Sequence, residues 1–124
     1  MTKNNGTALT REGILGVTDR ELVKVIVPEW HGAVWIRTMT GAERYDFEIP
    51  GPGGQLNLKQ IRERLLVKAL CDEKGKRLFT DDDVDSLSER NATVIDRLFD
   101  TARTINKIGD DAVDAEEKKS EGDR

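Results

Sequence analysis

The chain has one cysteine and one histidine among its 124 residues, and aromatic side chains make up only 5% of it. A single cysteine, Cys71, excludes an internal disulfide, and its apolar neighbourhood favours a small buried thiol over a reactive one. His31 lies beside a glycine in an expected loop, where nothing in the sequence supplies the partner that a catalytic base needs. We therefore predict neither an enzyme nor a bound cofactor.

Long apolar runs are also missing. No stretch approaches the roughly 20 residues that a helix needs to cross a bilayer. The first ten residues are polar and contain no apolar segment of the signal-peptide type. We expect a cytosolic protein that does not enter membranes.

Positive charge is not concentrated anywhere. Residues 109–124 hold seven acidic and three basic side chains, which accounts for the whole formal net charge of -4 and leaves residues 1–108 neutral. This balance lacks the basic stripe of a nucleic-acid-binding protein. The segment 59–68 does contain four bases, so a small regulatory or nucleic-acid-binding module stays open as an alternative.

The acidic stretch from Asp72 to Asp83 does not have the spacing of a calcium-binding loop. Counted from Asp72, the third and fifth positions are Lys74 and Lys76, where an EF-hand loop places oxygen ligands. Two ammonium groups there would repel the ion. We predict a polar turn followed by a helix cap, and no metal.

Two β-type runs form the expected start of the domain. Residues 22–27 are rich in β-branched side chains, and residues 33–39 form a second run, joined to the first by Pro28–Gly32. So short a connector predicts a β-hairpin. The two-residue period places Val23, Val25 and Val27 on one face of the first strand, with Lys24 on the other.

Helices are predicted for the rest of the chain up to residue 108. Capping-box spacing at Thr40–Glu43 and at Asn57–Gln60 marks two helix starts. The first of these helices should end near Ile49, before the Pro-Gly segment 50–54. The expected helical segments are a short turn at 10–16, then about 41–49, 58–71, 80–87 and 91–108, with Gly109 as the last stop.

These elements define an α+β fold, in which an N-terminal β-hairpin packs against three to four α-helices. We assign residues 1–20 to a flexible arm with one short helix, 21–108 to a single globular domain, and 109–124 to a disordered acidic tail.

Five aromatic residues near loops and caps are the candidates for contact with a partner protein: Trp30, Trp35, Tyr45, Phe47 and Phe79. Trp30, at the tip of the hairpin, either folds back over the core or stays exposed as an anchor. Trp35 lies in the middle of a strand, where packing in the core is favoured.

In the order and spacing of several segments, the chain resembles the tail assembly chaperones of long-tailed bacteriophages and prophages. The residues that carry the resemblance are Arg11–Leu15, the strand that ends in Val27-Pro28-Glu29-Trp30, Thr40–Arg44, the Asp72–Gly75 turn with Arg77-Leu78-Phe79, and the last helix. The chain departs from that pattern at His31, which lies between Trp30 and Gly32, at Met39 and at Lys74.

The resemblance implies a non-enzymatic role. Members of this family coat the long tape-measure protein, keep it soluble and help recruit tail tube subunits. They act in the host cytoplasm during tail assembly and are absent from the mature virion. The expected partners are thus the tape-measure and tail tube proteins. A homo-oligomer is also expected, because so small a domain gains from burying more surface. A structural tail-completion or connector protein remains the alternative within phages.

Overall fold

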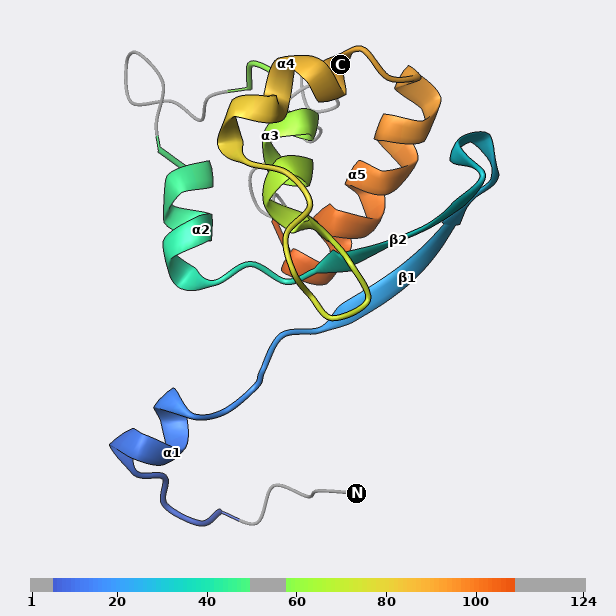
Figure 1. The fold of residues 1–124 in the computed structure, drawn as a ribbon. Coiled ribbons are helices and arrows are strands. Elements are labelled where there is room, and N and C mark those ends of the chain that lie inside the picture. Colours follow the sequence, from blue (N-terminus) through green and yellow to red (C-terminus); the bar gives the residue numbers. More distant parts are fainter. Residues whose placement is uncertain (1–5, 50–57, 109–124) are drawn as a thin grey trace, which may run out of the picture.

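The computed structural model describes residues 6–49 and 58–108 (Figure 1). Its first large element is the predicted hairpin. Strands β1 (Leu22–Val27) and β2 (Gly32–Arg37) run antiparallel, with Val25 opposite Val34. The predicted faces of β1 are confirmed, because Val27 is fully buried while Ile26, on the same face as Lys24, is 60% exposed. On β2, Ile36 is fully buried.

A third strand was not predicted. The helix expected at 58–71 is shorter, since α3 spans Ile61–Ala69 and the chain then continues as strand β3 (Leu70–Cys71). β3 pairs with β2, opposite Trp35 and Ile36, which gives a three-stranded antiparallel sheet in the order β1-β2-β3. The edge of β2 supplies hydrogen-bond partners that hold this apolar pair extended, although its periodicity suits a helix.

The start of α3 also differs from the expected capping box. Leu58 lies before the helix and is 57% exposed. The N-cap is Gln60, with φ of 50° and no side-chain capping bond. Asn57, the expected cap, lies outside the described residues.

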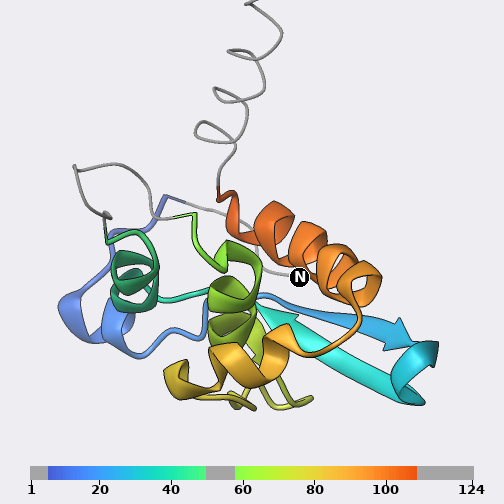
Figure 2. The same ribbon diagram turned by 90° about the horizontal axis from the view of Figure 1, so that it is seen from above.

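Helices α3 and α5 (Ala92–Asn106) pack against each other and lie on the same side of the hairpin (Figures 1 and 2). Between them and the sheet lies the core, whose fully buried members include Leu65, Leu66, Leu70, Val94 and Leu98. Asn91 caps α5 by accepting from the Thr93 and Val94 amides. The helix ends at Lys107, with φ of 54°, two residues before the predicted stop at Gly109, which lies outside the described residues.

Asn106 joins the end of α5 to the sheet. Its Oδ1 accepts from the Met39 amide at 2.7 Å, and its Nδ2 donates to the Arg37 carbonyl at 3.3 Å. This buried amide therefore fixes α5 against the link that follows β2.

The shorter helices begin where their caps predict. Helix α2 (Gly41–Phe47) has the Thr40–Glu43 capping box, and the short η3 turn (Asp81–Asp83) follows its cap Thr80 and leads into α4 (Val84–Ser88). Helix α1 (Arg11–Leu15), capped by Thr10, has no buried residue and lies away from the body of the fold (Figure 1). The α+β class is confirmed. The expected acidic tail, 109–124, lies outside the described residues.

Candidate partner-binding site

Trp30 lies at the tip of the hairpin, at the end of a short 3-10 turn (η1, Pro28–Trp30). Proline sets the first φ of this turn, and His31 closes it in the left-handed region, with φ of 60° and its amide donating to the Pro28 carbonyl at 3.0 Å. This geometry turns the indole back against the core, where it is half-buried. Trp30 thus packs on the core and still keeps an accessible surface.

Phe79 lies in the same region as Trp30, although it is distant from it in the sequence. After β3 the chain makes a tight turn, in which Gly75 adopts φ of 84°. It returns beside β3, where the Leu78 amide donates to the Leu70 carbonyl at 3.1 Å. Leu78 then points outward, 50% exposed, while Phe79 packs partly against the core.

Trp30 and Phe79 meet in a surface pocket of about 440 Å³. Leu87 of α4 completes its apolar wall, and Ser86 and Arg90 form the polar part. Two predicted contact residues that are 49 positions apart in the sequence are therefore brought together. A pocket with apolar walls can receive an apolar side chain of a partner.

Arg90 adds a charge to this pocket. Among the residues that the structure describes, its guanidinium makes no hydrogen bond or ion pair. It is thus available for a carboxylate beside the apolar group in the pocket. Ser86, Leu87 and Arg90 were not predicted as site residues from the sequence. Ser86 and Leu87 lie on α4 and Arg90 lies just after its end, and nothing in this local pattern shows that Trp30 packs beside them.

The other three candidates lie elsewhere. Phe47 is only 1% exposed within the core, so its ring cannot touch a partner in this fold. Tyr45 is 72% exposed on α2, at the opposite end of the molecule from the tip of the hairpin (Figures 1 and 2). These positions remove Phe47 from the contact set and separate Tyr45 from the pocket.

Trp35 was predicted to pack in the core, but it does not. It lies on the outer face of the sheet, the face away from α3 and α5, with the Lys24 ammonium 5.5 Å from its ring centre. Cys71, opposite it on β3, is fully buried and directs its Sγ toward the Trp35 carbonyl at 3.4 Å. Burial raises the pKa of the Cys71 thiol, which fits the predicted unreactive cysteine.

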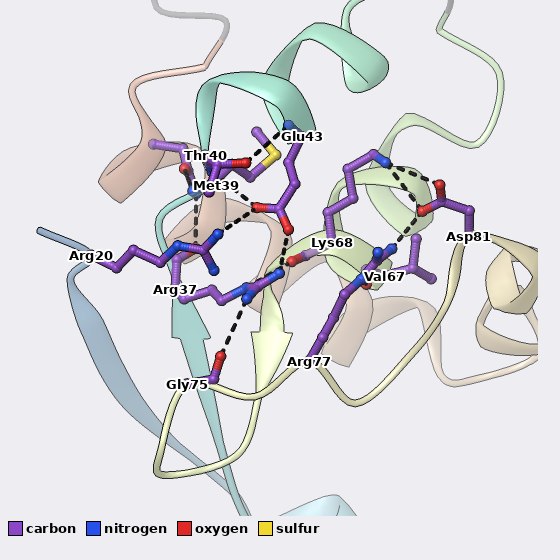
Figure 3. Close-up of polar contacts among 11 residues, drawn as sticks. Arg20, Arg37, Met39, Thr40, Glu43, Val67, Lys68, Gly75, Arg77 and Asp81 are labelled. Carbon is purple, nitrogen blue, oxygen red and sulfur yellow. Dashed lines mark hydrogen bonds and ion pairs between the residues drawn. The ribbon is translucent and has the colours of Figure 1, made fainter. Parts of the chain in front are cut away.

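A polar network ties the sheet to the helices (Figure 3). The Arg37 guanidinium, buried at the end of β2, donates to the Glu43 carboxylate at 2.6 Å, to the Lys68 carbonyl at 3.1 Å and to the Gly75 carbonyl at 3.2 Å. Arg20 adds a second contact to Glu43 at 3.4 Å. Burial lowers the pKa of Arg37, and the nearby Glu43 opposes this shift. The network is structural, because one cation holds β2, α2, α3 and the 72–77 turn together.

A second cluster caps the carboxyl end of α3. Arg77 donates to the Val67 carbonyl at 2.7 Å, and both Arg77 and Lys68 pair with Asp81 (Figure 3). The hydrogen bond from Arg77, aided by Lys68, lowers the pKa of the Asp81 carboxyl. Cations at this end of a helix also suit its dipole. Each charge of the cluster is engaged in holding the fold.

The tip of the hairpin is tied to α5 by an exposed ion pair. Arg97 donates to both oxygens of Glu29, at 3.0 and 2.9 Å. These bonds lower the pKa of Glu29 from 4.5 to about 2. A carboxyl with a depressed pKa stabilises the fold above its unfolded value and loses that effect as the pH falls through its folded value.

We therefore expect the stability difference between the wild type and Glu29→Gln to be constant above pH 4.5 and to shrink between pH 4.5 and 2. Denaturant unfolding at a series of pH values measures it. Glu89→Gln, at an exposed position without a side-chain hydrogen bond or ion pair among the described residues, serves as the control. An equal pH dependence for both variants would show that the ion pair does not form in solution.

Two further features are absent from the described part of the chain. Within 6–49 and 58–108, no helix is long and apolar enough to span a bilayer. In the same ranges, no three His, Cys, Asp or Glu side chains gather as ligands for a metal ion.

Comparison with known proteins identifies the family. The family model described as "Phage tail assembly chaperone" matches residues 53–121, more than half of the chain. Among solved structures, the chain is similar to the tail assembly chaperone of bacteriophage HK97, with a TM-score of 0.55 and 23% identity over 69% of this chain and 81% of that one. At that identity the likeness shows the fold. The comparison with curated proteins gives no match. On the evidence of the family model, the chain belongs to the phage tail assembly chaperone family.

Proposed function

We propose that this protein is a non-enzymatic chaperone that binds the tape-measure protein of a phage tail, keeps it soluble during assembly and helps recruit tail tube subunits. Its membership of the tail assembly chaperone family supports this role. The observation that carries it is the pocket of Trp30, Phe79 and Leu87, with Arg90 at its edge. Two of the candidate aromatic residues, Trp30 and Phe79, meet in this pocket.

The size of the pocket suits a chaperone that must later leave. A volume of about 440 Å³ accommodates one or two apolar side chains. Stable protein interfaces bury about 800 Å² on each partner. We propose a contact confined to this pocket and its rim, which would bury less than that area and would exchange readily when the tube replaces the chaperone around the tape measure.

The chemistry of the pocket also describes the segment that it receives. An apolar side chain would fill the space between Trp30 and Phe79, and an acidic side chain one turn away on the same helical face would pair with Arg90. We propose that this pattern recurs along the tape-measure protein. Many chaperone copies could then bind one tape measure.

Co-expression tests the proposed activity. The tape-measure protein of the source phage should be largely insoluble when made alone and should move to the soluble fraction when this chain is co-expressed. Quantitative gel analysis of both fractions measures the shift. The same soluble fraction with and without the chain would contradict the proposal, provided that the chain itself is folded and abundant.

The remaining parts of the proposal concern location and self-association. We place the protein in the host cytoplasm during assembly and outside the mature virion. A homo-oligomer is also proposed, and it is supported by the arm around α1, where four large apolar side chains are more than half exposed: Leu9, Ile14, Leu15 and Val17. Light scattering of the purified chain should give a mass above that of one copy, and a single-copy mass at all concentrations would contradict self-association.

A further inference from the structure

The sheet has one open edge. In the order β1-β2-β3, strand β1 pairs with β2 alone, so its other side has no neighbouring strand among the described residues. The opposite edge is different, because β3 has only two residues and Cys71 is bridged to Arg77 of the returning chain. Within the described residues, the six residues of β1 thus form the long free edge of the sheet (Figure 1).

The register fixes which backbone groups point to that edge. The Thr38 amide donates to the Glu21 carbonyl at 3.1 Å, and these two residues continue the β1–β2 register by one step. Hydrogen-bonded and non-hydrogen-bonded pairs alternate in an antiparallel ladder. Residues 21, 23, 25 and 27 therefore bond to β2, whereas Leu22, Lys24 and Ile26 direct both N–H and C=O away from it.

This edge carries little of the usual protection against added strands, since a single charged residue, Lys24, is the guard present on it. Natural sheets guard such edges with proline, bulges, shortened strands or charges. Strand β1 is six residues long and pairs with β2 without a break in register. Its one charge, Lys24, lies over the Trp35 ring on the outer face, between the exposed side chains of Leu22 and Ile26.

We propose that β1 accepts an extended segment of a different protein as an antiparallel fourth strand, in which an acidic residue faces Lys24 and an apolar residue lies two positions to either side. The backbone of that segment would complete the hydrogen bonds of Leu22, Lys24 and Ile26. Its apolar side chains would lie beside Leu22 and Ile26 on the outer face, and its carboxylate would pair with the Lys24 ammonium.

A second copy of this chain fits the edge poorly. Two β1 strands related by a two-fold axis, paired in the centred register, place Lys24 opposite its own equivalent, and like charges directly opposite each other are unfavourable. Shifting one β1 strand by two residues relative to the other separates the two lysines, but fewer residues then pair between the strands. The partner is therefore a different chain. This surface is separate from the Trp30–Phe79 pocket, and the inference holds whether or not the pocket binds the tape measure.

A pair of blocked peptides tests the proposal. The probe acetyl-Thr-Leu-Thr-Glu-Thr-Ile-Thr-amide carries the apolar–acidic–apolar pattern on one face, and the matched peptide has lysine in place of glutamate. In the free protein, the amides of Leu22, Lys24 and Ile26 should exchange with solvent quickly. At millimolar glutamate peptide they should slow at least about tenfold, with little change for the lysine peptide.

Variants of Lys24 separate backbone pairing from charge. Lys24→Glu should reverse the preference between the two peptides. Lys24→Pro removes an N–H that faces the edge and leaves the bonds to β2, so it should abolish peptide binding, whereas Lys24→Thr should keep weaker binding. Unchanged binding to Lys24→Pro would overturn strand addition.

Modified peptides give the same test on the wild-type protein, in case Lys24→Pro does not fold. In the proposed register, the glutamate amide of the peptide points toward β1 and the adjacent threonine amides point away. N-methylation at the glutamate should abolish binding, and N-methylation at a neighbouring threonine should preserve it. Equal effects of the two modifications would overturn the proposal, as would edge protection that rises with protein concentration in the absence of peptide.

Discussion

Replacing Arg37 with methionine should lower the free energy of unfolding by about 3 kcal/mol or more. The side chain is only 7% exposed and donates to one carboxylate and two backbone carbonyls. Methionine fills similar space but leaves Glu43 as a largely buried charge without its main partner, and the carbonyls of Lys68 and Gly75 lose a donor. Chemical denaturation measures the change, which is a large share of the 5–15 kcal/mol typical of a domain.

Two further variants locate the cause. Arg37→Lys keeps the charge but not the fork of donors that reaches three acceptors, so it should still lose more than about 1 kcal/mol. Arg62→Met removes an exposed ion pair with Asp96 and should cost less than about 1 kcal/mol. If Arg37→Met and Arg62→Met were equally stable, the network around Arg37 would not be what joins the sheet to the helices.

Replacing Trp30 with alanine should weaken binding of the tape-measure protein by about 30-fold or more, the effect of losing about 2 kcal/mol at an interface anchor. The indole forms a wall of the pocket with Phe79 and Leu87, and its loss opens that wall to water. The same variant should reduce the amount of soluble tape-measure protein on co-expression. Titration by calorimetry or interferometry gives the affinity.

Because Trp30 also packs on the core, its replacement needs controls that separate folding from binding. Arg90→Glu changes a side chain without a partner among the described residues, so it should leave the melting temperature within a few degrees and still weaken binding. Tyr45→Ala removes an exposed aromatic far from the pocket and should bind like the wild type. If Tyr45→Ala weakened binding and Arg90→Glu did not, the contact surface would lie on α2.

The elements that local chemistry determines were predictable from the sequence. The hairpin followed from two β-branched runs around Pro28, and the Thr40–Glu43 box marked the start of α2. In both, the decisive interactions connect residues a few positions apart. The buried thiol of Cys71 was likewise foreseen from its apolar neighbours.

The structural predictions that failed concern residues whose conformation or burial depends on segments distant in the sequence. Leu70 and Cys71 continue a helical pattern, yet they form a strand because they pair with the edge of β2. Trp35 is on the outer face because Val34 and Ile36 occupy the inner one, and the alternation alone does not say which face meets the helices. The pocket needed Trp30, Phe79 and α4 to be placed together, which no local pattern contains.

The most direct test of the chaperone role is affinity capture of the tagged, full-length chain from cells in which the source phage is assembling tails. Mass spectrometry would identify the captured proteins and would examine purified virions in parallel. We expect that the tape-measure protein is captured, that Arg90→Glu captures less of it, and that virions lack this chain. Capture of no tail protein, or the presence of this chain in virions at the level of a structural subunit, would contradict it.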